Sequence, residues 1–232
     1  MLILFDIDAT LITTGGVGVR AMGDAGRELF GDAFTEHRIE YAGRLDPLIL
    51  VDLLRDNGLE VSGNNIAALR DAYRRHLVRR LPSAGARALP GVHALLSALV
   101  EREDVTVGLL TGNFAETGVM KLAASSIDPA IFKIAVWGDH SPHTPPMREH
   151  LPPLGIARFQ SARGRGPRRT VIVGDTPHDV SCALRNGCEC LGVATGKFSC
   201  ASLLESGATH ALQDLSDTRA VLEWLCDRPE AS

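Results

Sequence analysis

The chain has 232 residues, which allows one large domain or a core with a smaller insert and is ample to bury a core. Hydrophobic residues make up 45% and charged residues 22%, which is ordinary for a soluble globular protein. Because the formal charge is −4, there is no basic excess that would favour nucleic acid or an anionic membrane as the main partner.

The apolar runs and the cysteines bear on where the protein works. The longest runs, such as Leu2–Phe5 and Val105–Leu110, are far too short to span a bilayer. No basic region precedes an apolar stretch at the N-terminus, so we expect no secretory signal and predict a cytoplasmic location. The five cysteines are odd in number and loosely spaced, which indicates buried thiols rather than disulfides or a zinc site.

Short apolar runs rich in β-branched residues recur along the chain, with helical patterns between them. Because the runs are continuous rather than alternating, they are typical of strands covered on both faces of a parallel sheet. The predicted strands are Leu2–Phe5, Val105–Leu110, Ile134–Trp137, Thr170–Val173 and Leu191–Ala194. Helices are predicted from Asp46, as N-cap, to Gly58, and around Ile66–Leu77, Val92–Leu99, Arg148–Ala162 and Pro177–Asn186.

The order of these elements divides the chain into two parts. From about Thr14 to Leu89 there is no convincing strand, whereas strands and helices alternate after it. We therefore predict an α/β protein whose open, Rossmann-like parallel sheet core is formed by residues 1–14 and 90–232. Residues 15–89 are predicted to form an inserted α-helical cap.

The first predicted strand runs directly into two acids, Asp6 and Asp8. Ligands of an open α/β sheet bind outside the carboxyl ends of its strands. Acids two residues apart in an extended chain project to the same side, and two carboxylates there repel each other unless a cation is present. A divalent metal would relieve the repulsion, and oxygen ligands favour magnesium over zinc.

Two further strands also end in polar residues. These are Thr111, Gly112 and Asn113 after the strand ending at Leu110, and Asp175 and Asp179 after the strand ending at Val173. The first group combines a hydroxyl, backbone N–H groups and a helix start, which together favour phosphate binding. In the second group, Asp175 is placed to complete the metal site, and Asp179 to orient the site or fix a cation. Three such motifs in this order predict an active site.

These motifs resemble those of the haloacid dehalogenase superfamily, in the phosphoglycolate-phosphatase-like branch with a helical cap after the first motif. The sequence DIDAT at Asp6–Thr10 is similar to the first motif, LTGN at Leu110–Asn113 to the second, and GDTPHDV at Gly174–Val180 to the fourth. Ala42–Leu50 resembles a cap segment that many members carry near the substrate. The similarity covers nearly the whole chain.

The resemblance implies a magnesium-dependent phosphatase that hydrolyses a small organic phosphate monoester through an aspartyl-phosphate. Asp6 would attack phosphorus, and Asp8 would protonate the leaving oxygen and then deprotonate water. Mg²⁺ would be held by Asp6, the backbone carbonyl of Asp8 and Asp175. Thr111 and nearby N–H groups would hold the phosphate oxygens. In the cap, Arg44 is expected either to contact the substrate or to pair at the surface with Asp46.

The sequence departs from the family's pattern in two places. Ala9 follows Asp8 at a position where glycine is commonest, and a small side chain should be tolerated there. The third motif normally supplies a lysine, but residues 138–169 contain none.

Three basic residues could replace that lysine. Arg148 is the predicted one, because it lies between the second and fourth motifs and arginine can grip phosphate oxygens with two donors. Lys121 is the runner-up, but two helical turns carry it about 12 Å along its helix, which predicts that it is too far from Thr111. Lys133 sits at the start of a strand, at the wrong end of the sheet.

Other interpretations stay open at this point. A phosphomutase on the same scaffold would also keep Asp8, and a catalytically impaired binding protein of this fold would explain the missing lysine. The glycine-rich run Gly16–Ala21 suits a hinge into the cap better than a dinucleotide site. His140, His143 and His150 suit solvated loop residues better than zinc ligands. The sequence leaves monomer and homodimer equally open.

Overall fold

The computed structural model describes residues 1–226, and its centre is a six-stranded parallel sheet in the order β5-β4-β1-β6-β7-β8. The strands are β1 (Leu2–Phe5), β4 (Thr106–Leu110), β5 (Ile134–Val136), β6 (Thr170–Gly174), β7 (Glu189–Val193) and β8 (His210–Leu212). The five predicted strands are confirmed, with ends that differ by at most two residues. The short edge strand β8 was not predicted, since none of its three residues is buried and no long apolar run marks it.

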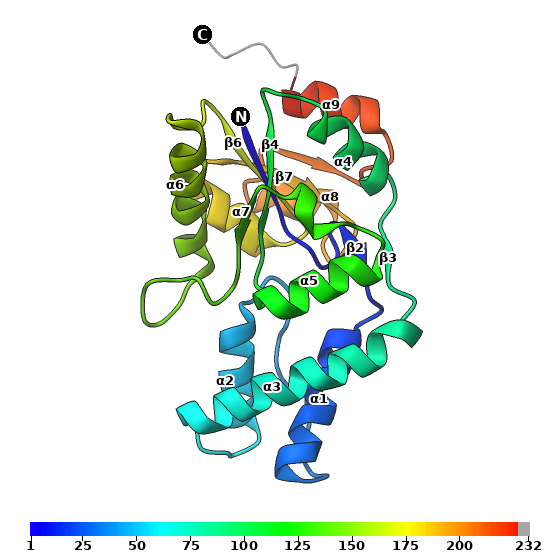
Figure 1. Ribbon diagram of the computed structural model, residues 1–232, viewed down its shortest axis with the longest axis vertical. Coiled ribbons are helices and arrows are strands. Elements are labelled where there is room, and N and C mark those ends of the chain that lie inside the picture. Colours follow the sequence, from blue (N-terminus) through cyan, green and yellow to red (C-terminus); the bar gives the residue numbers. More distant parts are fainter. Residues whose placement is uncertain (227–232) are drawn as a thin grey trace.

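Helices cover both faces of this sheet (Figure 1). One face carries α4 (Val92–Val100), α5 (Ala115–Ala124) and α9 (Thr218–Cys226). The other carries α6 (Leu151–Arg163), α7 (Pro177–Leu184) and α8 (Cys200–Glu205). In Figure 1, α6 and α7 lie to the left of the sheet, and α4 and α9 to its right. The predicted open α/β fold is therefore confirmed.

The first strand shows why a continuous apolar run is needed. Ile3 and Phe5 pack into the cluster under α4 and α9, while Leu2 and Leu4 pack into the cluster under α6 and α7. All four side chains are fully buried, and burying each contributes roughly 1.5–3 kcal/mol. A polar residue at any of these positions would face a hydrophobic core. Because both faces of β1 are packed in this way, the strand is held rigidly and fixes where the chain after Phe5 emerges at the carboxyl end of the sheet.

The segment between β1 and α4 forms a separate helical group, drawn at the bottom of Figure 1. It contains α1 (Val17–Phe30), α2 (Asp46–Asp56) and α3 (Gly63–Arg80), which share their own buried cluster. Two-residue strands β2 (Ile12–Thr13) and β3 (Arg87–Ala88) pair antiparallel where the chain leaves and re-enters the core. The expectation of no strand before Leu89 is wrong for β3, while the boundaries 15–89 remain a prediction.

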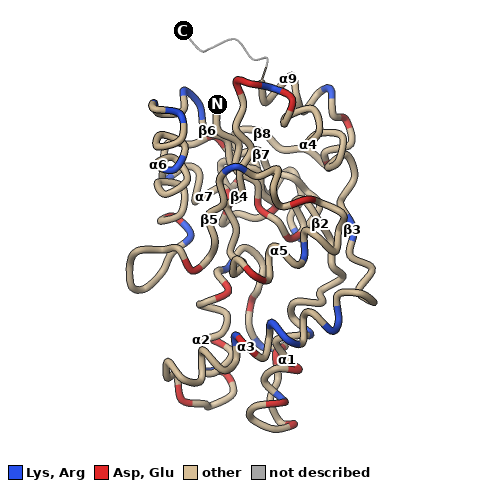
Figure 2. The backbone as a smooth tube through the Cα atoms, viewed as in Figure 1, with Lys and Arg blue, Asp and Glu red and all other residues tan. Residues whose placement is uncertain are grey.

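Charged side chains on the helical group are largely paired with one another. Figure 2 shows basic residues along α3 beside acidic residues of α1. Arg75 lies 2.5 Å from Glu28, and Arg80 contacts Asp24. Exposed pairs of this kind stabilise a protein by at most about 1 kcal/mol each. They are thus better explained as a solvated helix face than as a binding surface.

The described part of the chain gives two further findings on the wider context. Within residues 1–226, no helix is both long and apolar enough to cross a membrane. Cys182, Cys188 and Cys190 are buried as free thiols. The cytoplasmic location stays a prediction.

Candidate active site

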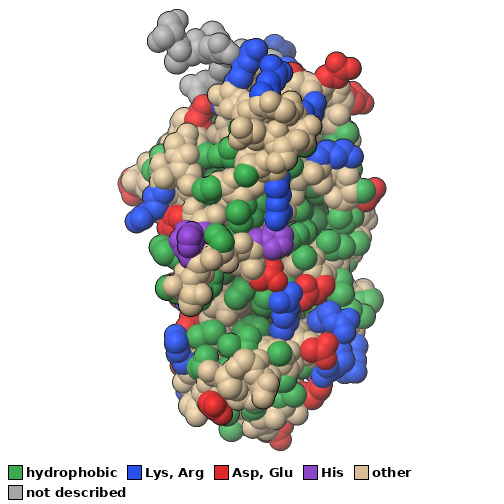
Figure 3. Space-filling model, turned by 60° about the vertical axis from the view of Figure 1, so that its left-hand side comes forward, with side chains coloured by type: hydrophobic (Ala, Val, Ile, Leu, Met, Phe, Trp, Pro, Cys, Tyr) green, Lys and Arg blue, Asp and Glu red, His purple; other side chains and the backbone are tan. Residues whose placement is uncertain are grey.

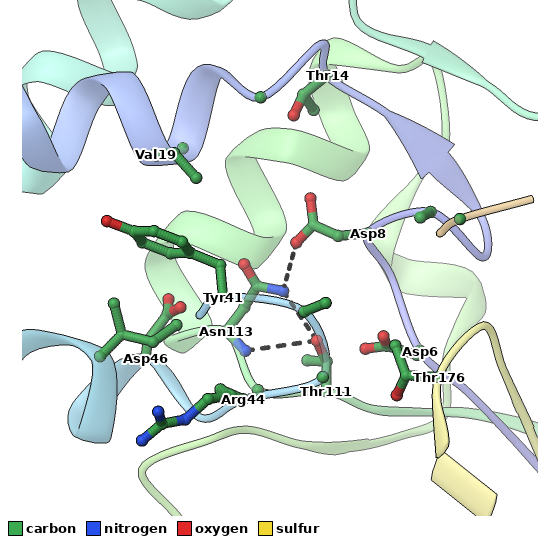
Figure 4. Close-up of a pocket in the computed structure, with 18 of the residues that line it drawn as sticks. Asp6, Asp8, Thr14, Val19, Tyr41, Arg44, Asp46, Thr111, Asn113 and Thr176 are labelled. Carbon is green, nitrogen blue, oxygen red and sulfur yellow. Dashed lines mark hydrogen bonds between the residues drawn. The ribbon is translucent and has the colours of Figure 1, made fainter. Parts of the chain in front are cut away.

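A cavity of about 570 Å³ lies between the carboxyl end of the sheet and the helical group. Residues after β1, β4 and β6 line its floor, and residues of α1, of α3 and of the segment before α2 line its opposite wall. Figure 4 shows labelled side chains of both parts around it. The three motifs that the sequence placed at strand ends therefore meet in one pocket, as expected of a parallel sheet.

Three carboxylates gather at the floor of the cavity. Asp6, Asp175 and Asp179 each offer an oxygen within 4.8 Å of the others, and all three side chains are buried. Burial raises the pKa of Asp6 to about 6 and, together with repulsion from Asp179 and Asp6, raises the pKa of Asp175 to about 8. The expected convergence of Asp6, Asp8 and Asp175 thus takes a different form, because the Asp8 carboxylate lies outside this cluster.

Arg148 reaches the same floor from the short helix before α6. Its Nη2 lies 2.5 Å from Asp179 Oδ1 and 3.2 Å from Asp6 Oδ1, and its side chain is only 5% exposed. Burial acts to lower the pKa of this guanidinium, but the two carboxylates outweigh it and raise the pKa. Asp179 also accepts bonds from the Thr176 N–H and hydroxyl, which fixes it at the start of α7. Arg148 therefore lies beside Asp6, the position that a cation replacing the third-motif lysine has to occupy.

Asp8 has a second, separate set of partners. Its Oδ2 accepts hydrogen bonds from Asn113 Nδ2 at 2.9 Å and from Lys121 Nζ at 2.7 Å. Lys121 also donates to Asn113 Oδ1 at 2.6 Å, and Asn113 Nδ2 donates to Thr111 Oγ1 at 2.8 Å. Burial acts to lower the pKa of Lys121, but Asp8 and its neighbours outweigh it and raise the pKa.

The prediction that Lys121 lies too far away is therefore wrong. The helical rise separates backbone positions, whereas side chains in a helix lean toward its N-terminus and lysine is long. Lys121 extends back along α5 and reaches Asn113 and Asp8 at the pocket. Lys133 is exposed and donates to the Ala130 carbonyl at 3.2 Å, away from the cavity.

The chain after β4 forms a compact turn into α5. The Thr111 side chain is fully buried, and Gly112 is packed so closely that a Cβ there would lie 2.0 Å from the Arg44 carbonyl oxygen. Thr111, Gly112 and Asn113 all line the cavity just before the N-terminus of α5, where backbone N–H groups favour an anion. Their role in phosphate binding remains a prediction.

The segment Gly43–Asp46, before and at the start of α2, packs directly against the core. The Gly43 carbonyl accepts a bond from Arg148 Nη1 at 3.2 Å, and the Asp46 N–H donates to the Gly112 carbonyl at 2.7 Å. The Asp46 carboxylate accepts from the Phe114 N–H at 3.1 Å. The prediction of Asp46 as N-cap of α2 is wrong: Leu45 holds that position, and Asp46 instead serves the start of α5.

Arg44 lines the cavity, but its guanidinium is turned away from Asp6 and Asp8 (Figure 4). It pairs with Asp52 at 2.5 Å, on the first turns of α2, and its side chain is 28% exposed. The alternative partner named for it, Asp46, is thus not the one it uses. Its contact with substrate remains a prediction.

Ala9 adopts the left-handed conformation, with φ at +57°. This explains the family's glycine there, because a Cβ in this conformation costs about 1–2 kcal/mol. The strained turn is held by the Thr195 hydroxyl, which donates to the Ala9 carbonyl at 2.5 Å. The sequence thus tolerates alanine at this position only against a steric penalty.

The acid cluster fits a magnesium ion by its chemistry. All three side chains of the cluster offer carboxylate oxygens. Hard divalent cations such as Mg²⁺ prefer oxygen ligands, whereas zinc does not depend on them. The upward pKa shifts of Asp6 and Asp175 show that the protein alone does not compensate these buried charges fully. A bound divalent cation would supply the missing positive charge.

The histidines do not form a comparable cluster. Figure 3 shows histidine side chains at mid-height on one face of the molecule. The His143 ring packs edge-on against His150, whose Nδ1 lies 2.7 Å from Ser141 Oγ. Among residues 1–226, the one group of three or more metal-ligating side chains that satisfies the distance limit is the acid cluster.

Comparison with known proteins agrees with this geometry. A family model described as haloacid dehalogenase-like hydrolase matches residues 3–193. A 5'-nucleotidase from Pseudomonas aeruginosa is 32% identical over 140 residues, and the match spans only 59% of each chain. A phosphoglycolate phosphatase from Yersinia pseudotuberculosis is 25% identical over 202 residues, covering 84% of this chain and 81% of that one. A hydrolase structure from Pseudomonas syringae shares the fold, with a TM-score of 0.73, 21% identity and coverage of 97% and 99%.

Proposed function

Because the chain belongs to the haloacid dehalogenase-like hydrolase family and is an enzyme of the phosphoric monoester hydrolase class, we propose that it releases phosphate from a small organic monoester, with Mg²⁺ bound and Asp6 as nucleophile. The observation that carries the proposal is the unequal placement of the two first-motif acids. Asp6 lies buried in the acid cluster beside Arg148, whereas 43% of the Asp8 side chain is exposed to the cavity.

The two placements suit two different tasks. In the first step, an Asp6 carboxylate oxygen forms a bond to phosphorus while the bond from phosphorus to the ester oxygen breaks, and Asp8 gives its proton to that oxygen. In the second step, water attacks phosphorus, Asp8 takes a proton from the water, and the bond to Asp6 breaks. Phosphate leaves, and both carboxylates return to their starting states.

The remaining groups would hold the phosphate and its charge. Arg148, Thr111 and the N–H groups at the start of α5 would bind the non-bridging oxygens. Asp6, Asp175 and the backbone carbonyl of Asp8 would hold Mg²⁺, which when bound offsets the repulsion between carboxylate and phosphate. Asp179 would orient Arg148, to which it is bonded at 2.5 Å.

The cavity supports a small substrate. Its volume of about 570 Å³ falls within the range of small-molecule sites, and the helical group roofs it. Apolar side chains of the wall, including Val19, Met22 and Ile49, leave room for an organic group beyond the phosphate. We therefore propose a low-molecular-weight ester rather than a phosphoprotein.

A p-nitrophenyl phosphate assay tests the proposal. We expect hydrolysis that needs Mg²⁺, disappears after exhaustive chelation and returns when Mg²⁺ is added. Asp6→Asn should lower kcat by several orders of magnitude, as loss of other covalent catalysts does, and should leave the circular dichroism spectrum unchanged. Near-normal turnover by Asp6→Asn would reject the mechanism. A panel of small phosphate esters would then identify the substrate.

Two alternatives are separated by the same assay. A phosphomutase would transfer phosphate to an added sugar phosphate in preference to water. A catalytically impaired binding protein would hydrolyse none of the esters, and its main support, the missing lysine, is weakened by the position of Arg148 beside Asp6.

A further inference from the structure

Two buried cations line the pocket, and they serve different acids. Arg148 contacts Asp6 and Asp179, while Lys121 contacts Asp8 and Asn113. Within residues 1–226, no hydrogen bond or ion pair joins Lys121 to Asp6, or Arg148 to Asp8. The proposed reaction uses one basic side chain, Arg148, to bind the phosphate. Lys121 therefore has no role in that reaction as described so far.

Lys121 is held in a way that fixes Asp8. Its side chain is 6% exposed, and its Nζ donates to Asp8 Oδ2 at 2.7 Å and to Asn113 Oδ1 at 2.6 Å. Asn113 closes the triangle by donating from Nδ2 to the same Asp8 oxygen at 2.9 Å. Because both donors bind Oδ2, the orientation of the carboxylate is determined. The other oxygen, Oδ1, accepts no hydrogen bond from residues 1–226.

The helical group covers the ammonium from the other side. A Cβ at Gly18, on the first turn of α1, would lie 3.5 Å from both Lys121 Nζ and the Tyr73 hydroxyl. That hydroxyl is buried and has no hydrogen-bond partner among the described residues. Lys121 is therefore enclosed between the core and α1, where it has little freedom to move toward Asp6.

We propose that Lys121 is a positioning residue for proton transfer: with Asn113, it holds Asp8 so that Oδ1 faces the ester oxygen of the substrate. The inference rests on the proposed function, because it assumes that Asp8 protonates the leaving group. It gives the chain two cations with separate tasks, Arg148 on the phosphate and Lys121 on the acid that releases the alcohol.

A matched pair of aryl esters tests this role. Phenyl phosphate and p-nitrophenyl phosphate have similar shapes, but phenolate, with a pKa of about 10, is the poorer leaving group and depends more on protonation. In the full chain with Mg²⁺, Lys121→Met should lower kcat/KM for phenyl phosphate by about 100-fold, the lower end of the usual general-acid contribution. For p-nitrophenyl phosphate the loss should be much smaller. Lys133→Met, an exposed control, should change neither rate.

Two further variants separate positioning from packing. If Lys121 acts through Asp8, adding Lys121→Met to Asp8→Asn should lower the phenyl phosphate rate no further, since coupled residues are non-additive. Lys121→Arg keeps a donor and should recover much of the phenyl phosphate rate, which also covers the case that Lys121→Met fails to fold.

The outcomes distinguish this inference from the proposed function. Equal losses on the two esters, or full additivity with Asp8→Asn, would overturn the role of Lys121 while leaving the phosphatase intact. Absence of hydrolysis of both esters by the wild type, or activity of Asp6→Asn, would instead overturn the proposed function.

Discussion

The carboxyl ends of β1, β4 and β6, called the sheet edge below, and the helical group form the two sides of the pocket by different means. The sheet edge supplies side chains, namely the acids after β1 and β6 and the polar turn after β4. The helical group supplies mainly apolar lining and main-chain contacts, such as the Gly43 carbonyl on Arg148 and the Asp46 N–H on Gly112. The reacting groups are thus concentrated on rigid strand ends. The residues of the wall that contacts the organic part of a substrate can be replaced without changing these groups.

This division predicts which substitutions should change catalysis, which should change substrate preference and which should change stability. Altering a sheet-edge side chain that binds the phosphate should affect all esters alike, because every ester presents the same phosphate. A change at Asp8 should instead depend on the leaving group, because Asp8 is proposed to protonate it. Altering the helical group should affect esters according to their organic part. Contacts between the two regions should influence stability more than chemistry.

The largest effect after loss of Asp6 is expected at Arg148, on the sheet side. Arg148→Ala should lower kcat/KM by at least about 100-fold for every ester, since it removes a buried charge-assisted contact to the reacting centre. Arg148→Lys should retain most activity, because one ammonium could lie near both Asp6 and Asp179 where Nη2 now lies. Steady-state kinetics on two unrelated esters measure both.

Arg148→Ala also leaves the buried carboxylate of Asp179 unpaired, which destabilises proteins by roughly 3–5 kcal/mol. Its melting temperature should therefore be checked, and Arg148→Lys provides the folded comparison. If Arg148→Ala is silent while Lys121→Ala is inactive on every ester, the cation that serves phosphate lies on α5 and our assignment is wrong.

The sequence predicted the strand-end motifs better than the side chains that helices carry to the pocket. Strand motifs such as Asp6–Thr10 are local, so position after an apolar run suffices to place them at the sheet edge. Lys121 and Asp46 were misplaced because their contacts depend on side-chain direction and on how α2 meets α5. Such distances between segments far apart in sequence follow from tertiary packing, which spacing along one helix does not reveal.

A smaller and selective effect is expected at Arg44, on the helical side. Arg44→Ala should raise KM for the best ester in the panel by about tenfold, the value of one charged contact, and should change KM for p-nitrophenyl phosphate less. The matched control is Asp52→Asn, which breaks the observed pair without removing the guanidinium. Equal changes in KM for both esters would show that Arg44 merely supports α2.

Asp46 joins the two regions, and its effect should appear in stability. The charges of Lys121 and Asp8 act on its carboxylate. The carboxylate also accepts hydrogen bonds from the Phe114 N–H and the Thr117 hydroxyl. Burial raises its pKa from 3.8 to about 6, so the folded state binds this proton more tightly than the unfolded state. Its contribution to stability is therefore fully present below about pH 4 and is lost as pH rises through about 6.

Denaturant unfolding of the wild type and Asp46→Asn from pH 4 to 7 measures this contribution. Relative to the variant, the wild type's free energy of unfolding should fall over this interval by up to about 3 kcal/mol. Asp32→Asn, at an exposed position, should follow the wild type. Parallel pH profiles for the wild type and Asp46→Asn would contradict the assignment.

The smallest effect is expected at Ala9, where the sheet edge turns toward the helical group. Its φ of +57° places the Cβ in a conformation that costs about 1–2 kcal/mol, and glycine removes that strain. Glycine also loses more conformational entropy on folding, by roughly 0.5–1 kcal/mol, so the net gain from Ala9→Gly should not exceed about 1.5 kcal/mol. Differential scanning calorimetry should show a rise in melting temperature of about 3–6 °C at most. Ala123→Gly, exposed near the end of α5, carries the entropy loss without relief of strain and should lower it. A lower melting temperature for Ala9→Gly would mean that the turn gains more from the rigidity of alanine than it loses to strain.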